Sequence, residues 1–200
     1  MSAERRAFAR QIGRWYSSQR YVAESNDRPR ISLHIKNQAG VESDVLAGAR
    51  TEVERIFGDA GIKVAPVDAD QPGRITILLL NITRDSREDS SRCALGLALA
   101  SRGMAYVFVN RILRATRNRP VDLPVVLGRV IAHEIGHILM PPGQHSNFGI
   151  MRADLDFGYT NPNRFSDEEA RRIQSRLRAS RGQRPSQRSD RVPLPDVFGL

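Results

Sequence analysis

The sequence predicts an α+β domain in which a twisted mixed sheet of four to five strands packs against helices. Three observations predict this class. Short apolar segments with strand periodicity alternate with segments of helical periodicity. The run 75–82 is continuously apolar, which is typical of a central strand. A long apolar helix is expected after the last strand, and a second helix near the C-terminus.

The first half of the chain supplies a strand, a helix and two further strands. Apolar and polar residues alternate over 31–35, which predicts a half-buried strand. Apolar residues recur at helical spacing over 45–57, and glycines follow, so we expect a helix that ends there. The segment 63–67 is expected to be a short strand, and 75–82 a strand covered on both faces.

The second half supplies two more strands and two helices. Strands are expected at 93–99 and 104–110, joined by a hairpin turn at 101–103. Pro124 is suited to the first turn of the apolar helix that follows, because a proline there loses no helical hydrogen bond. The last helix is expected from Asp167 to about Leu177.

The histidines are unevenly distributed, since three of the four lie between residues 133 and 145. Two of them frame His133-Glu134-Ile135-Gly136-His137, an H-E-x-x-H pattern with apolar flanks. Residues four apart lie on one face of a helix, so the two imidazoles can share a zinc ion. Glu134 can then reach a metal-bound water without being a ligand, as a general base must. The apolar flanks predict a buried helix, whose polar groups need partners such as zinc.

His145 is the expected third ligand. Pro141 and Pro142 end the helix, and Gly143 allows the chain to reverse toward the first two histidines. Three protein ligands and a water form the open arrangement of a catalytic zinc site. The single cysteine, Cys93, cannot supply the thiolate set that closes a structural site.

Four carboxylates further along the chain are alternative third ligands: Asp154, Asp156, Glu168 and Glu169. The two glutamates belong to Ser166-Asp167-Glu168-Glu169, a capping box that opens the last helix. The aspartates are therefore the stronger of these rivals to His145.

From Val130 to Met151 the sequence resembles the metzincin metallopeptidases, and most of all their matrixin-type branch. The shared features are H-E-x-x-H, a short turn, His145-Ser146 and then Gly149-Ile150-Met151. One departure is that His145 comes two residues later than the third histidine of the family pattern. The resemblance implies that His133, His137 and His145 are zinc ligands. It also implies that Glu134 is the base and that Met151 lies beneath the metal.

The resemblance also implies how a substrate is held. In that family an antiparallel edge strand borders the cleft, and an extended peptide pairs with it. The matching segment here is 93–99. An edge strand has free backbone donors and acceptors, so it can hold a peptide without reading its side chains.

Together these residues predict a zinc-dependent endopeptidase that acts on a peptide or protein substrate. Glu134 would take a proton from the attacking water and pass it to the leaving amine. Two alternatives stay open: a zinc hydrolase of a non-peptide amide, and a non-enzymatic module that holds zinc structurally and binds an acidic partner through its Arg-rich ends. Glu134 argues against the second, because a structural site needs no base.

Length and charge divide the chain into three parts. We expect a basic N-terminal extension at 1–30, a metallopeptidase domain at 31–179 and a disordered basic tail at 180–200. The net charge is +9, of which 1–30 contributes +4 and 171–200 contributes +6, while 31–170 carries −1. Because the basic charge is confined to the ends, we do not expect the central domain to bind nucleic acid.

Further expectations concern the compartment and assembly. No apolar run is long enough to span a membrane, and the N-terminus shows no signal-peptide pattern. The default expectation is a cytoplasmic protein, or a secreted one if the true start of the chain lies upstream. We also expect a monomer.

Overall fold

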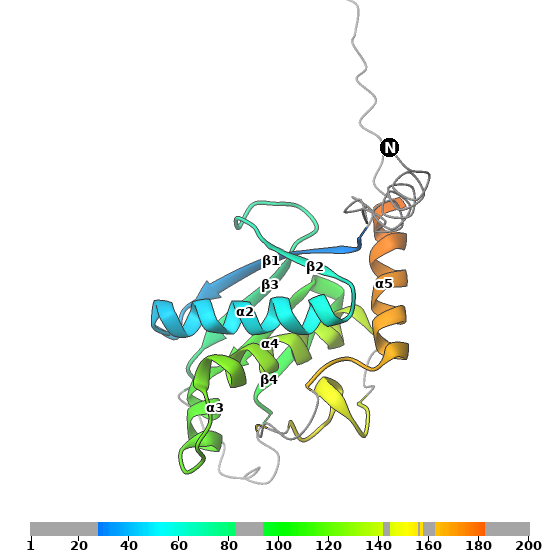
Figure 1. Ribbon diagram of the computed structural model, residues 1–200. Coiled ribbons are helices and arrows are strands. Elements are labelled where there is room, and N and C mark those ends of the chain that lie inside the picture. The colour runs from blue at the N-terminus through cyan, green and yellow to red at the C-terminus, as the bar shows by residue number, and fades with distance from the viewer. Residues whose placement is uncertain (1–27, 83–93, 142–144, 156, 158–162, 183–200) are drawn as a thin grey trace, which may run out of the picture.

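The computed structural model describes residues 28–82, 94–141, 145–155, 157 and 163–182. Within these residues a five-stranded sheet has the order β2-β1-β3-β5-β4 (Figure 1). Four of its strands are parallel, namely β1 (Arg30–Asn37), β2 (Lys63–Pro66), β3 (Ile75–Leu80) and β5 (Met104–Phe108). The edge strand β4 (Gly96–Leu99) runs antiparallel to β5. The predicted mixed sheet with an antiparallel edge strand is confirmed.

Two long helices pack against one another and against the sheet. They are α2 (Ser43–Asp59) and α4 (Leu123–Leu139), and α2 lies along α4 in front of the strands (Figure 1). Helix α5 (Asp167–Gly182) stands at the side of this layer and contacts α4. The predicted α+β class is confirmed, with the motif-bearing helix and the C-terminal helix where they were expected.

The core lies between the sheet and the helices α2 and α4. One face of β3 contributes Ile75, Ile77 and Leu79, which are buried, and α2 contributes the fully buried Phe57. The residues of β3 that point the other way, at positions 76, 78 and 80, are only half-buried. The expectation that this strand is covered on both faces is therefore met on one face only.

The segment 104–110, expected to be one strand, divides into β5 and a helix, α3 (Val109–Thr116). Asn110 accounts for the end of the strand. Its side-chain amide donates to the carbonyl of Ile82 at 2.7 Å and accepts from the Ile82 amide at 3.3 Å. Ile112, which is fully buried, and Thr116 then turn inward at helical spacing. The strand prediction was wrong for the last two residues because the tertiary contact with Ile82 outweighs their strand pattern.

Local signals at two other boundaries are confirmed. A 3-10 helix at Ala100–Arg102 and Gly103, with φ of 59°, form the turn between β4 and β5. The Ser166 amide donates to Glu169 Oε2 at 2.7 Å and the Glu169 amide to Ser166 Oγ at 3.3 Å, so the capping box forms. Helix α5 then continues to Gly182, beyond the expected end near Leu177.

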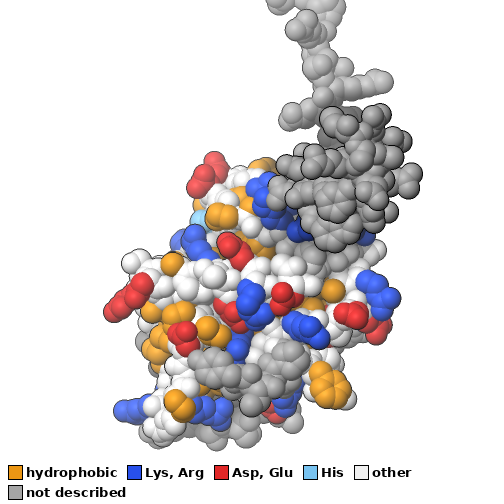
Figure 2. Space-filling model, in the orientation of Figure 1, with side chains coloured by type: hydrophobic (Ala, Val, Ile, Leu, Met, Phe, Trp, Pro, Cys, Tyr) orange, Lys and Arg blue, Asp and Glu red, His pale blue; other side chains and the backbone are white. Residues whose placement is uncertain are grey.

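Charges of both signs are interspersed on the face shown in Figure 2. This mixture agrees with the nearly neutral charge of residues 31–170. Among the described residues, none of the helices combines the length and apolar character that crossing a membrane requires. The expected extension at 1–30 lies outside the described residues except for its last three positions. The expected tail at 180–200 also lies outside them except for residues 180–182, which form the end of α5.

Candidate metal centre

The H-E-x-x-H motif occupies the last two turns of α4. This helix begins with Pro124 in its first turn and ends at Leu139, before Pro141, as expected. Apolar residues on nearly all sides of α4 bury it within the core. His133 and Glu134 are each only 6% exposed. The motif is thus carried by a buried, well-packed helix, which is a rigid support for a site.

Three histidine side chains converge at the C-terminal end of α4. The Nε2 atom of His137 lies 3.0 Å from Nε2 of His133 and 3.1 Å from Nε2 of His145. The His137 ring is nearly perpendicular to the other two, at 84° and 86°. Within the described residues, this trio is the group of His, Cys, Asp or Glu side chains placed to hold a metal ion.

The ring of His133 is oriented from its other nitrogen. Nδ1 lies 2.8 Å from the carbonyl oxygen of Ile150, to which it donates as the protonated nitrogen. Nε2 is then left with a lone pair that points at the other two histidines. This is the arrangement in which an imidazole binds a metal through one nitrogen and is held by a backbone carbonyl through the other.

Burial favours the neutral form of the His133 and His137 imidazoles. The pKa of His133 is lowered, chiefly because burial disfavours the charged form, and the neighbouring His145 adds to the effect. The pKa of His137 is lowered to about 4 by burial first, and then by His133 and His145. Neutral imidazole is the form that coordinates metal, so the site is electrostatically ready for a cation.

The residue that follows His145 is bonded to the segment 148–151. The amide of Ser146 donates to the carbonyl oxygen of Met151 at 2.9 Å, and Ser146 Oγ donates to the carbonyl oxygen of Phe148 at 2.6 Å. These bonds tie the residue next to His145 to the turn beneath the histidines. The two extra residues of the turn therefore do not prevent the third histidine from joining the pair.

The donor set fits a tetrahedral metal such as zinc. Bonds of about 2.0–2.1 Å to imidazole nitrogens place two such nitrogens about 3.3 Å apart in a tetrahedral complex. The Nε2 separations of 3.0 and 3.1 Å lie close to this value. Three imidazoles suit zinc as well as copper, iron or nickel, so the ligands alone do not select one metal.

The other candidate ligands are placed elsewhere or fall outside the described part of the chain. Asp154 lines the neighbouring cleft but does not join the trio. Glu168 pairs with Arg172, and Glu169 serves in the capping box. Asp156 lies outside the described residues. The fourth histidine, His34, bonds through Nδ1 with the Val67 carbonyl oxygen at 3.2 Å, far along the chain from the trio.

Glu134 projects between the helix and the edge strand. A Cβ atom built on Gly96 of β4 would meet Oε1 of Glu134 at 2.5 Å and its Cδ at 2.6 Å. The Glu134 side chain therefore fills the space that a larger residue would need at position 96. Burial raises the pKa of this carboxyl group to about 7. A carboxyl group with a pKa near neutrality is suited to accept and release a proton at physiological pH.

In the metal-free protein, Glu134→Gln is expected to increase stability above neutral pH. Between pH 4.5 and about 7 the folded protein holds a proton on Glu134 that the unfolded chain has released. Glu134 therefore destabilises the fold progressively as pH rises through this window, by up to about 3 kcal/mol above it. Urea unfolding of both proteins in chelator, at pH 4 and pH 8, measures the difference. An equal gain at both pH values would contradict the explanation.

Gly136, inside the motif, allows a close approach from below. A Cβ atom at this position would overlap Sδ of Met151 and would lie 3.2 Å from Met151 Cε and from Phe165 Cε1. Met151 is fully buried. The methionine is thus packed directly against the helix between the two motif histidines. A glycine within a helical segment was an available signal for such a contact.

Gly136→Ala is expected to destabilise the protein by about 1–3 kcal/mol, because the new methyl group overpacks the contact with Met151. Gly58→Ala, in α2, is the matched control, since a Cβ atom there meets nothing within 4 Å. The control should gain up to about 1 kcal/mol from helix propensity. Denaturant unfolding measures both, and equal behaviour of the two variants would show that Gly136 makes no close contact.

A cleft of about 700 Å³ opens beside the histidines. Its walls are formed mainly by the edge strand β4, the helix α4 and the segment after Met151. Among the lining residues are Gly96, Leu97, Glu134, Asp154 and Phe157. Leu97 is 52% exposed. The strand predicted at 93–99 thus borders the cleft, although it begins at Gly96, and Cys93 lies outside the described residues.

Comparison with known proteins identifies no family for this chain. No protein-family model matches the chain, and no curated protein matches it. Among solved structures, the zinc-dependent peptidase of Methanocorpusculum labreanum (strain Z) is similar over 73% of this chain and 100% of its own, with 15% identity and a TM-score of 0.44. A likeness this distant carries no functional argument. The function of the chain must therefore be inferred from its own site, in which three histidines could hold a metal ion.

Proposed function

We propose that the protein is a zinc-dependent peptidase of metzincin-like type. The observation that carries the proposal is the convergence of His133, His137 and His145 on one point, beside the buried carboxyl group of Glu134. Three protein ligands leave a coordination position open, and an adjacent base is a requirement of hydrolysis. A purely structural metal site gives no reason to bury Glu134 at a cleft.

The three histidines, Glu134 and Ile150 each have a role in the proposed reaction. The Nε2 atoms of the three histidines would hold zinc, which when bound acts as a Lewis acid and lowers the pKa of water. The carboxylate of Glu134 accepts the proton of the attacking water and delivers it to the nitrogen of the leaving amine. The Ile150 carbonyl keeps the Nδ1 proton of His133 in place throughout.

The edge strand supports a peptide substrate over a small amide. One side of β4 pairs with β5, and residues 94–98 line the cleft beside Glu134. An extended peptide can pair with the remaining edge of β4 through backbone hydrogen bonds. Such pairing would align a scissile carbonyl group along the line of the strand, in front of Glu134 and the histidines.

Metal-dependent cleavage of unstructured protein tests the proposal. The purified full-length chain is incubated with casein or a mixed peptide library, with a chelator, and with chelator followed by zinc. We expect cleavage that the chelator stops and zinc restores, with about one zinc per chain by mass spectrometry. Cleavage of non-peptide amides alone would favour the first alternative, and zinc binding with neither activity would favour a binding module.

The two charged side chains that line the cleft apart from Glu134 predict a substrate preference. Arg119 lies with its Cζ 6.0 Å from the ring centroid of Phe157, and Asp154 also lines the cleft. Peptides with an acidic residue near the scissile bond should lose about threefold to fivefold in kcat/KM in Arg119→Gln, the value of an exposed ion pair. Asp154→Asn should have the opposite effect, a loss in kcat/KM for peptides with a basic residue near the scissile bond. Unchanged ratios of acidic to basic peptides in both variants would remove these charges from recognition.

A further inference from the structure

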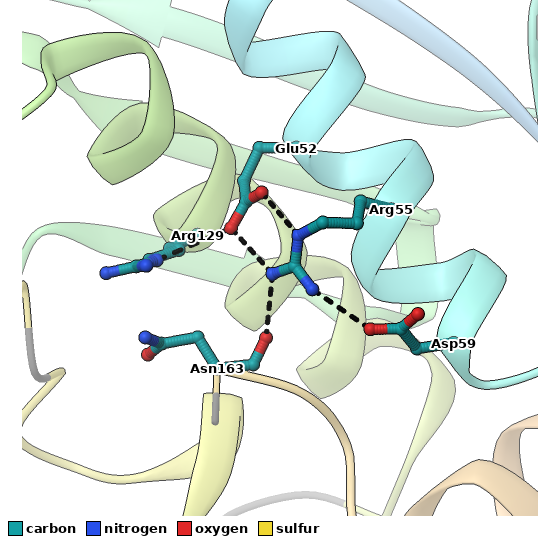
Figure 3. A network of polar contacts seen from close by, with 5 residues as sticks. All are labelled: Glu52, Arg55, Asp59, Arg129 and Asn163. Atoms are coloured by element: carbon teal, nitrogen blue, oxygen red, sulfur yellow. Dashed lines mark hydrogen bonds and ion pairs between the residues drawn. The ribbon is translucent and has the colours of Figure 1, made fainter. Parts of the chain in front are cut away.

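A polar network joins helix α2, helix α4 and the segment that begins at Asn163 (Figure 3). At its centre is Glu52, a carboxylate only 8% exposed. Arg55 donates to it twice, from Nε to Oε2 at 2.7 Å and from Nη2 to Oε1 at 2.8 Å. Arg129 of α4 donates from Nε to Oε1 at 3.4 Å. A buried carboxylate requires such partners, and this one joins the two long helices.

Arg55 extends the network to a third part of the chain. Its Nη2 atom donates to the backbone carbonyl oxygen of Asn163 at 3.2 Å. Asn163 begins the short segment 163–165 that leads into the capping box of α5, and it is 5% exposed. A guanidinium group that pairs with a carboxylate on one edge is held in a fixed orientation, so its remaining donor can hold a carbonyl in place.

Segment 163–165 in turn supports the turn beneath the histidines. The carbonyl oxygen of Arg164 accepts a hydrogen bond from the amide of Ile150 at 3.0 Å. The carbonyl oxygen of the same Ile150 accepts from Nδ1 of His133 at 2.8 Å. Phe165 packs on Phe57 of α2, with ring centroids 5.0 Å apart. A continuous series of contacts therefore runs from Arg55 to the ring of His133.

The network reaches His133 by a second route. Arg129 precedes His133 by one helical turn on α4, and Glu52 holds it from α2. Glu52 thus fixes both the helix that carries His133 and, through Arg55, the carbonyl that orients its ring. Helical packing alone would hold α4 but would not set the rotation of an imidazole about its side-chain bonds.

We propose that Arg55 is a positioning residue for the metal site, which holds segment 163–165 so that Ile150 orients His133. The proposal rests on the proposed function only in taking His133 as a metal ligand. Partners that directly orient a ligand change metal affinity by about 10–100-fold when removed. Arg55 acts two hydrogen bonds further away, so we expect a change at the lower end, about tenfold.

The test compares variants of the full-length protein at a temperature where all are folded. Arg55→Met keeps the aliphatic part of the side chain and removes its donors. It should weaken zinc binding about tenfold, measured by competition with a chromophoric chelator, and should shift the His133 Nδ1 signal in nitrogen NMR. Arg55→Lys should restore the affinity in part, since one ammonium group can reach Glu52 or the Asn163 carbonyl but not reproduce both contacts.

Two controls separate positioning from general destabilisation. Asp59→Asn removes the charge of a third partner of Arg55, whose Oδ2 lies 2.9 Å from Nη1. Val53→Ala removes fully buried methyl groups from the same helix and lowers stability without removing a hydrogen-bond donor or acceptor. Both should bind zinc within about twofold of the unmodified protein, because neither removes a hydrogen bond from Arg55 to Glu52 or to the Asn163 carbonyl.

Two results would overturn the proposal. One is a zinc affinity of Arg55→Met equal to that of Asp59→Asn, with an unchanged His133 signal. The other is an equal loss of affinity in Val53→Ala and Arg55→Met. Zinc binding by the unmodified chain without any hydrolysis would overturn the proposed function alone. Failure of the unmodified chain to bind zinc would overturn both.

Discussion

Glu134→Gln is expected to retain the metal and lose peptide hydrolysis, with kcat/KM falling by about 10²–10⁴-fold. Glutamine has nearly the same shape as glutamate and can occupy the space beside Gly96. It cannot accept a proton from water at neutral pH, so the step that Glu134 is proposed to perform is lost. The measurement pairs turnover of a fluorogenic peptide with zinc content by mass spectrometry.

The control for this variant is Glu54→Gln, which changes the same residue type at an exposed position of α2. It should leave turnover unchanged, because surface substitutions away from a site have small effects. Equal turnover of Glu134→Gln and the unmodified protein would remove Glu134 from the mechanism. Loss of zinc together with activity would instead make Glu134 a ligand or a structural residue.

His145→Ala is expected to weaken zinc binding by about 10²–10³-fold, since each ligand supplies about 3 kcal/mol of the binding free energy of a site with several ligands. The effect should be large although His145 is the most exposed of the three histidines, because its Nε2 lies 3.1 Å from that of His137. Competition with a chromophoric chelator measures the dissociation constant, and circular dichroism confirms that the variant is folded.

His34 provides the matched control for His145. Its Nδ1 contacts the Val67 carbonyl oxygen, and it does not belong to the trio. His34→Ala should therefore bind zinc as the unmodified protein does. The rival ligand is tested by Asp154→Ala, which is also expected to bind normally. Normal affinity in His145→Ala combined with a loss in Asp154→Ala would transfer the third ligand to the aspartate.

Glu134 and His145 are held in place by different parts of the structure. Glu134 is held by burial between α4 and Gly96, and it does not depend on the turn. His145 depends on the bond from Ser146 to Met151, and His133 depends on the carbonyl of Ile150. Removal of the base should thus leave the ligands in place, and removal of the third ligand should leave the base in place.

Most of the fold could be predicted because its signals are local. Alternation over 31–35, helical spacing over 45–57 and the capping box at Ser166 each involve residues close in sequence, and all three elements form. Helix α3 could not be predicted in this way. The end of β5 is decided by a contact between Asn110 and Ile82, which are distant in sequence.

The sequence by itself determined the pair of histidines on α4, because a spacing of four residues places two side chains on one face of any α-helix. Only the tertiary structure decided that His145 joins them, that Ile150 orients His133 and that Glu52 and Arg55 support this turn. The physical reason is that helix geometry repeats every few residues, whereas the path of a turn and the partners of a buried charge depend on segments brought together only by folding.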